Sequence, residues 1–222
     1  MPETRTGKHT LMKIVYSDIP MRRDLYPSVY TTEDKRENAK GEEVIFPVNA
    51  YLKGRMKKGE KVRIVLLAKS DPEGSSAVNT GIFRKECGGV NRGIGAEIEY
   101  VTLTTPFEET RDVHESLLRA MIGQLEPDAA LIADITYGPK PLPVLIFSVF
   151  GFAEKYFGAT VENILYGRAD FRDDGQGEDR PRPEHPHLCD LTSLYYLNSL
   201  TNVMEYASPD EAVRALETLT AL

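Results

Sequence analysis

The sequence contains no tryptophan, only two cysteines and no apolar run long enough to cross a bilayer. Cys87 and Cys189 form no CxxC pair, so the chain offers no thiolate metal site. Low cysteine usage is typical of a reducing compartment, and we expect a cytoplasmic protein. The strongest apolar stretch, Leu142 to Phe152, predicts a buried helix, and residues 1–10 are polar and charged, unlike a signal peptide. We therefore expect no membrane insertion.

Positive charge and familiar catalytic motifs are also missing. The formal net charge is −7, whereas duplex DNA or RNA usually requires a basic face, so we expect no duplex nucleic acid as partner. A small phosphorylated ligand in a local pocket is compatible with this charge. We find no HExxH motif, Ser/His/Asp order or metal-ligand cluster, and expect neither metal nor cofactor. Two Arg-x4-His pairs, Arg180 with His185 and Arg182 with His187, lie among prolines and are predicted to be loop residues.

Apolar runs and amphipathic segments alternate along the chain. Strands are predicted at residues 11–16, 62–68, 98–103, 129–135, 161–166 and 188–191. Helices are predicted at residues 44–56, 79–87, 108–125, 141–157, 192–206 and 209–219. Loops are predicted at residues 21–41, 88–95 and 168–187, the first of them over the site. This order predicts an α/β fold with a Rossmann-like doubly wound, mostly parallel sheet over residues 11–206, followed by a short C-terminal helix within residues 207–222.

Polar residues follow several of the predicted strands. The candidate ligand-binding residues in these turns are Ser17, Asp18, Ser70, Asp71, Thr136, Tyr137, Gly138 and Thr192. The carboxyl ends of parallel strands meet at one edge of a sheet, so these residues can converge although they are far apart in sequence. The alternative is that each of them merely caps a helix.

The segment from residue 129 to residue 152 carries the strongest signal. An apolar run ends in the turn Thr136–Lys140, and a second apolar run follows directly, which predicts a strand, a tight turn and a helix. Pro139 and Pro141 suit a helix start, where no N–H donor is needed. Lys140 in the first helical turn opposes the helix macrodipole, and a bound anion would offset that cost. The predicted ligand is therefore an anion.

Three segments carry a family resemblance. Residues 134–143 (DITYGPKPLP) resemble the Asp-x-Thr-His-Gly-x-Arg/Lys-x-x-Pro motif of CRISPR-associated Rossmann-fold (CARF) proteins, in particular the Csx1/Csx2-like family. Residues 161–167 (VENILYG) are similar to a strand of that family, and residues 190–192 (DLT) to its late Asp-Leu-Thr signature. The three occur in the family's order, but Tyr137 stands where the family has histidine.

The resemblance implies a homodimer that binds cyclic tetra- or hexa-adenylate, the second messenger of type III CRISPR systems. By matching position, Tyr137, Gly138 and Lys140 would contact phosphate or ribose, and Ser17 and Asp18 would line the opposite wall. Thr136 would support the turn. The loops at 21–41 and 70–80 are candidates for the adenine pockets. Family members usually carry a C-terminal effector, whereas only residues 208–222 follow the last motif here.

Three functions stay open from the sequence. The first is a metal-independent ring nuclease, in which Lys140 stabilises the developing phosphorane charge and Ser17 orients the reacting ribose. The second is a non-catalytic sensor that acts through a partner or a removed effector domain. The third is an unrelated Rossmann-like enzyme that acts on a nucleotide or sugar phosphate.

Overall fold

The computed structural model describes residues 11–32, 43–171, 183–203, 205 and 208–220. The strands are β1 (Lys13–Asp18), β2 (Thr31–Thr32), β3 (Lys61–Ser70), β4 (Glu97–Pro106), β5 (Ala130–Asp134), β6 (Thr160–Phe171) and β7 (Pro183–Asp190). The helices are α1 (Pro47–Arg55), α2 (Ser75–Asn91), α3 (Arg111–Ile122), α4 (Pro141–Phe157), α5 (Thr192–Val203) and α6 (Pro209–Thr220).

The strands form one sheet of seven in the order β2-β7-β6-β5-β1-β3-β4. The five strands β1, β3, β4, β5 and β6 run parallel, and β7 pairs antiparallel with β6. The chain passes from β1 to β3 and β4 on one side, and then returns to β5 on the other side of β1. The switch point of the topology therefore lies between the carboxyl ends of β1 and β5, where open α/β sheets bind ligands.

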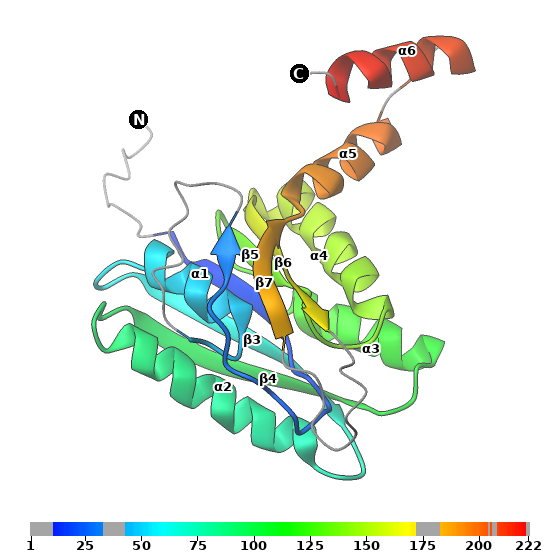
Figure 1. Cartoon of the computed structure of the whole chain (residues 1–222). Coiled ribbons are helices and arrows are strands. Elements are labelled where there is room, and N and C mark those ends of the chain that lie inside the picture. The colour runs from blue at the N-terminus through cyan, green and yellow to red at the C-terminus, as the bar shows by residue number, and fades with distance from the viewer. Residues whose placement is uncertain (1–10, 33–42, 172–182, 204, 206–207, 221–222) are drawn as a thin grey trace, which may run out of the picture.

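Helices cover both faces of the sheet, which confirms the predicted Rossmann-like doubly wound fold (Figure 1). On one face α1 and α2 contribute Leu52 and Phe83 to a core that includes Ile64 of β3. On the other face α3 and α4 contribute Met121 and Phe150 to a second core. All six residues of β1 are buried, because the strand lies in the middle of the sheet between these two layers.

Two loop predictions were wrong in part. The loop predicted at 88–95 begins later, because α2 continues to Asn91. The Asn91 side chain then holds the turn by bonding the N–H and C=O of Ala96 at 2.9 Å each. The loop predicted at 168–187 is replaced at both ends by the antiparallel pair β6 and β7, with Arg168 opposite His187.

The Arg-x4-His pairs lie partly outside the described residues, which exclude Arg180 and Arg182. His185 and His187 are residues of β7, and His187 Nδ1 lies 3.2 Å from Thr31 Oγ1 of β2. This strand accommodates Pro183 and Pro186 because only the two residues of β2 pair with its outer side.

Candidate functional site

The turn after β5 lies directly on the end of β1. Gly138 has φ +85°, and a Cβ atom on it would lie 3.0 Å from Asp18 Oδ2 and 2.9 Å from Leu142 Cδ1. Glycine is therefore required at this position both by the backbone conformation and by the space. The sequence prediction that the ends of β1 and β5 converge is correct, since Ser17 pairs with Asp134 in register.

A second set of contacts fixes the same turn to β6 and α1. Asp134 Oδ1 accepts hydrogen bonds from the Thr136 backbone N–H at 3.0 Å and from the Thr136 hydroxyl at 2.5 Å. The same Thr136 oxygen accepts from the Gly167 N–H at 2.8 Å, and Asp134 Oδ2 accepts from the Val48 N–H at 3.3 Å. A Cβ on Gly167 would lie 2.5 Å from Pro47 Cγ, so the strand and the helix start are in direct contact.

Ser17 and Asp18 lie beneath the turn, at most 1% exposed. Ser17 Oγ and both carboxyl oxygens of Asp18 have no hydrogen-bond partner among the described residues. Burial, with a smaller contribution from Asp134, raises the pKa of Asp18 well above its usual value. Burial also raises the pKa of Asp134 to about 6, against the lowering effect of its hydrogen bonds from Thr136 and Val48. The two carboxyl groups at the switch point therefore stay protonated up to a higher pH than an ordinary aspartate does.

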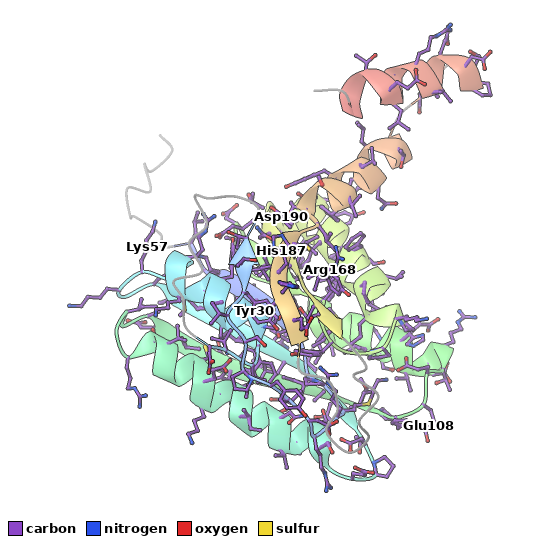
Figure 2. The ribbon with its side chains drawn as sticks, in the orientation of Figure 1. Tyr30, Lys57, Glu108, Arg168, His187 and Asp190 are labelled. Carbon is purple, nitrogen blue, oxygen red and sulfur yellow. The ribbon has the colours of Figure 1, made fainter. Side chains whose placement is uncertain are left out.

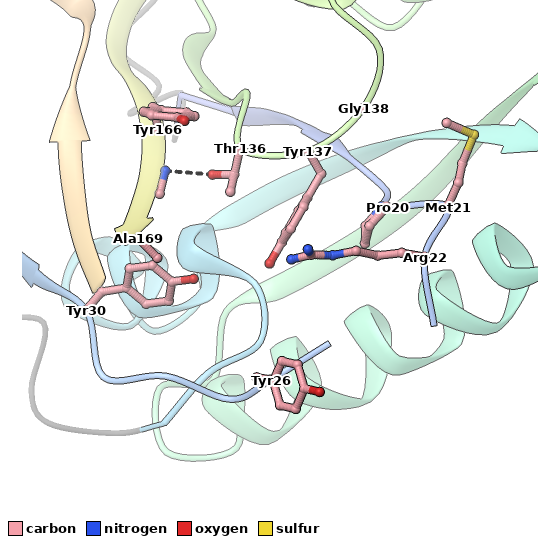
Figure 3. A pocket seen from close by; sticks show the side chains of 11 residues that line it. Pro20, Met21, Arg22, Tyr26, Tyr30, Thr136, Tyr137, Gly138, Tyr166 and Ala169 are labelled. Atoms are coloured by element: carbon pink, nitrogen blue, oxygen red, sulfur yellow. Dashed lines mark hydrogen bonds between the residues drawn. The ribbon is translucent and has the colours of Figure 1, made fainter. Parts of the chain in front are cut away.

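A cavity of about 550 Å³ opens above the turn (Figure 3). Its walls are residues 20–22, Tyr26 and Tyr30 from the first loop, the turn 136–138, and Tyr166, Gly167 and Ala169 from β6. Residues 21–32 of the predicted loop do lie over the site, and residues 33–42 are outside the described part of the chain. Among the described lining residues, four tyrosines and one arginine combine aromatic surface with a positive charge.

Arg22 and Tyr137 form the charged side of the cavity. The Arg22 guanidinium carbon lies 5.8 Å from the centre of the Tyr137 ring, a cation–π distance. The Tyr137 hydroxyl donates to the Ile45 carbonyl at 2.9 Å, which fixes the ring. Burial raises the pKa of Tyr137 to about 12, so the phenol is neutral under Arg22. Asn79 Nδ2 donates to the carbonyls of Pro20 and Arg22 at 2.8 Å each and holds the loop in place.

Three predicted ligand residues, Ser70, Asp71 and Thr192, lie outside the cavity lining, and Asp71 caps a helix. Asp71 accepts hydrogen bonds from the N–H groups of Glu73, Ser75 and Ser76 at the start of α2, which lower its pKa. Ser70 is an exposed neighbour of this cap. Thr192 Oγ1 accepts from the Ile164 N–H at 3.0 Å, and the Thr192 N–H donates to Asp190. None of the three residues lines the cavity. The capping alternative holds for Asp71, whereas the Thr192 hydroxyl ties the start of α5 to β6.

Lys140 stands at the N-cap of α4, two residues beyond Gly138, with an exposed side chain. It is not part of the cavity lining in this single chain. Its ammonium group belongs to the surface around the cavity rather than to its wall.

Sequence reasoning named the loop 21–41 as a candidate for the adenine pockets but did not single out Arg22, Tyr26 or Tyr30 within it, and it did not find Tyr166. The composition already indicated that tyrosine is the main large aromatic residue available to a binding surface, because the chain has eleven tyrosines and no tryptophan. Tyr26 and Tyr30 fall in a segment predicted as a loop, where a large ring has no helix or strand face to fill. Aromatic residues in such a loop are candidates for a binding surface.

No protein-family model and no curated protein matches this chain. Within the described residues, no group of three or more His, Cys, Asp or Glu side chains is placed to hold a metal ion. No described helix is long and apolar enough to cross a membrane.

Proposed function

We propose that the protein binds a cyclic oligoadenylate, the second messenger of type III CRISPR antiviral defence, and does so as a homodimer. The observation that carries this proposal is the tyrosine-lined cavity at the switch point, with the Arg22 guanidinium over the Tyr137 ring. A cation suits a phosphate group, and tyrosine rings stack on bases. The resemblance of residues 134–143 to the CARF motif favours a ring of adenylates over other nucleotides.

The size of the cavity supports a dimer. About 550 Å³ accommodates one small-molecule ligand, which is less than a ring of four or six nucleotides requires. A ring with internal symmetry matches two equal sites related by a two-fold axis. In the proposed complex each copy therefore holds one part of the ring.

An apolar stripe on α4 supplies the surface for this dimer. Val144, Phe152 and Tyr156 are spaced at multiples of four residues and are 67%, 37% and 63% exposed. Side chains at such spacing share one face of a helix. The stripe begins one turn after Lys140, so pairing of two α4 helices would bring both lysines towards the axis. In the proposed dimer Lys140 acts on the ring from this position.

We expect the double variant Val144→Glu/Tyr156→Glu to be monomeric, because it places charges in the proposed contact. Light scattering coupled to gel filtration measures the mass. The matched control is Val78→Glu, since Val78 is 64% exposed on α2, a helix on the opposite face of the sheet. A monomeric wild type, or a double variant that still dimerises, would contradict the proposed surface.

The proposed cleavage requires no metal. A ribose 2′-oxygen attacks the adjacent phosphorus, the bond to the 5′-oxygen breaks, and the 2′-proton leaves to solvent while the 5′-oxygen gains one. The products are a 2′,3′-cyclic phosphate and a 5′-hydroxyl. The protein contributes in-line positioning and charge stabilisation. Arg22 and Lys140 are the cations available for this role, whereas Ser17 lies below the turn and reaches a ribose only if the turn lifts.

The proposal is tested by incubating the protein with cyclic tetra- and hexa-adenylate in EDTA and following both rings by mass spectrometry. Linear products with a terminal cyclic phosphate identify a ring nuclease. An intact ring that co-elutes with a dimer identifies a sensor without cleavage. A ring that is neither retained nor changed contradicts the proposal and favours an enzyme acting on a mononucleotide or sugar phosphate.

Replacement of Lys140 by alanine should slow ring cleavage about 100-fold while the dimer persists, because one cation that faces the developing charge is lost. Single-turnover kinetics with enzyme in excess measure the cleavage step directly. Lys85→Ala is the matched control, an exposed lysine on α2. Equal rates for wild type and Lys140→Ala would remove Lys140 from the mechanism.

A further inference from the structure

Asp18 ends β1 with a carboxyl group that is covered and unpaired. It is 1% exposed, and neither of its oxygens has a hydrogen-bond partner among the described residues. Burial of an ionised carboxylate without a partner costs much more than burial of the neutral acid. The closed fold therefore holds Asp18 as a neutral acid, in agreement with the raised pKa of this group.

The turn after β5 forms a thin cover over this carboxyl group. An added Cβ on Gly138 would lie 3.0 Å from Asp18 Oδ2 and 3.1 Å from Asp18 Cβ, so the turn rests directly on the side chain (Figure 3). Gly138 itself is exposed. The neighbouring strands β3 and β5 flank β1 on both sides and are hydrogen-bonded to it. The turn is therefore the part of the cover that can move without breaking the sheet.

The turn is attached at two points, and Gly138 lies between them. On one side Asp134 accepts the Thr136 N–H at 3.0 Å. On the other side the Leu142 N–H donates to the Pro139 carbonyl at 3.0 Å, at the start of α4. Gly138 has no Cβ and changes its backbone angles at little cost. It can therefore act as the hinge of the turn.

The acidic and neutral groups around Asp18 do not favour its ionisation in the closed form. Asp134 of β5 adds to the effect of burial and raises the pKa of Asp18 further. Tyr137 of the turn stays neutral, since burial raises its pKa to about 12. Residues 141–153, which form most of α4, include no ionisable side chain.

The cations of the surrounding elements are engaged elsewhere or lie outside. Lys69 of β3 binds Glu109 at 2.8 Å. Arg22 of the first loop lies over an aromatic ring of the turn, and the Lys140 side chain is exposed. The strands on the far side of β5 carry two more basic residues, Arg168 and His187 (Figure 2). An Asp18 carboxylate thus gains its stabilisation from water, and water reaches it when the turn moves.

We propose that Asp18 and the turn 136–138 form a pH-operated cover, in which loss of the Asp18 proton lifts Gly138 from the end of β1 and lets water reach the carboxylate. Each pH unit above the ordinary pKa of aspartate favours the open, ionised form by a further factor of about ten, until the turn stays open. The open form adds a negative charge to the floor of the cavity, where it repels an anion. The cover is a property of the chain alone and does not depend on which ligand the cavity takes.

Hydrogen–deuterium exchange of the full chain, read by mass spectrometry at pH 5 and pH 8, tests the cover. Wild type and Asp18→Asn are compared at the same pH, so the intrinsic pH dependence of exchange cancels. At pH 5 they should exchange alike in the peptide that covers residues 135–142. At pH 8 the wild type should exchange about tenfold or more faster there, whereas Asp18→Asn stays closed. The control Asp112→Asn, which removes an exposed carboxylate from α3, should follow the wild type at both pH values.

Equal exchange of wild type and Asp18→Asn in this peptide at pH 8 would overturn the inference. A loss of protection that extends equally to β3 and β5 would also overturn it, because the whole fold then opens rather than the turn. If Asp18→Asn does not fold, the wild type alone decides: after correction for intrinsic exchange, residues 135–142 must lose protection relative to β3 between pH 5 and pH 8. No nucleotide is present in any arm, so the outcome is independent of any result with cyclic oligoadenylates.

Discussion

Loss of the Arg22 guanidinium is expected to weaken binding of cyclic tetra- and hexa-adenylate by about 1.5–3 kcal/mol, a factor of about 10 to 150. The reason is that Arg22 is the one cationic side chain among the described residues that line the cavity. Arg22→Ala also removes the cation over the Tyr137 ring, while Asn79 still holds the backbone of the loop. Isothermal titration calorimetry with each ring gives the affinity, and the slope of affinity against salt should decrease.

The next residue provides a matched control for Arg22. Arg23 points to the start of α2, where its guanidinium lies 3.3 Å from Ser75 Oγ and 3.1 Å from the Glu73 carbonyl. Arg23→Ala removes an identical charge from the same loop without touching the cavity. If both variants lose affinity equally, the effect comes from net charge or loop order, and the cavity is not the phosphate site.

Asp18→Asn is expected to stabilise the fold at pH 8 and to have little effect below pH 4. The pKa of Asp18 is raised in the folded chain, so the unfolded state ionises first and stability is lost as pH rises above the ordinary pKa. Asparagine carries no such cost. The thermal midpoint of the variant should therefore lie above that of the wild type at pH 8, and the two should approach each other in acid. Thermal denaturation between pH 4 and pH 8 measures this difference.

Asp71→Asn is a control for Asp18→Asn, because the pKa of Asp71 is lowered and its pH effect on stability should have the opposite sign. Hydrogen bonds from three backbone N–H groups lower the pKa of Asp71, so the carboxylate stabilises the fold above its ordinary pKa and this contribution is lost as pH falls. The Asn variant should be less stable than wild type at pH 8, and the difference should shrink in acid. A pH-independent effect of Asp18→Asn would mean that its carboxyl group ionises as it does in water.

The sequence predicted those parts of the fold that local chemistry decides. α4 runs from Pro141 to Phe157 as expected, because proline favours its start and Gly158, with φ +65°, ends it. Convergence of Ser17 and Asp18 with the turn after β5 followed from parallel topology. The end of α2 was missed, since Gly88 and Gly89 suggest a loop, yet the helix continues through both glycines.

The cavity itself could not be predicted, because tertiary contacts place its residues. Arg22 faces Tyr137 only because Asn79, which is distant in sequence, binds the carbonyls on either side of Met21. Nothing in the local sequence of residues 20–30 encodes that attachment. Asp71 shows the converse, since it satisfies both a site pattern and a capping pattern, and only its hydrogen bonds separate the two.

The hydroxyl of Thr136 connects the turn after β5 to the C-terminal helices through two hydrogen bonds and one strand. It accepts the Gly167 N–H of β6, and β6 in turn is bonded at Ile164 to Thr192, the first residue of α5. β6 is thus at once a wall of the cavity and the support of α5. If a bound molecule shifts the turn, the hydrogen bond between Thr136 and Gly167 should shift β6 as well. Because β6 is bonded to the start of α5, the movement should then reach α5, which leads away from the sheet (Figure 1).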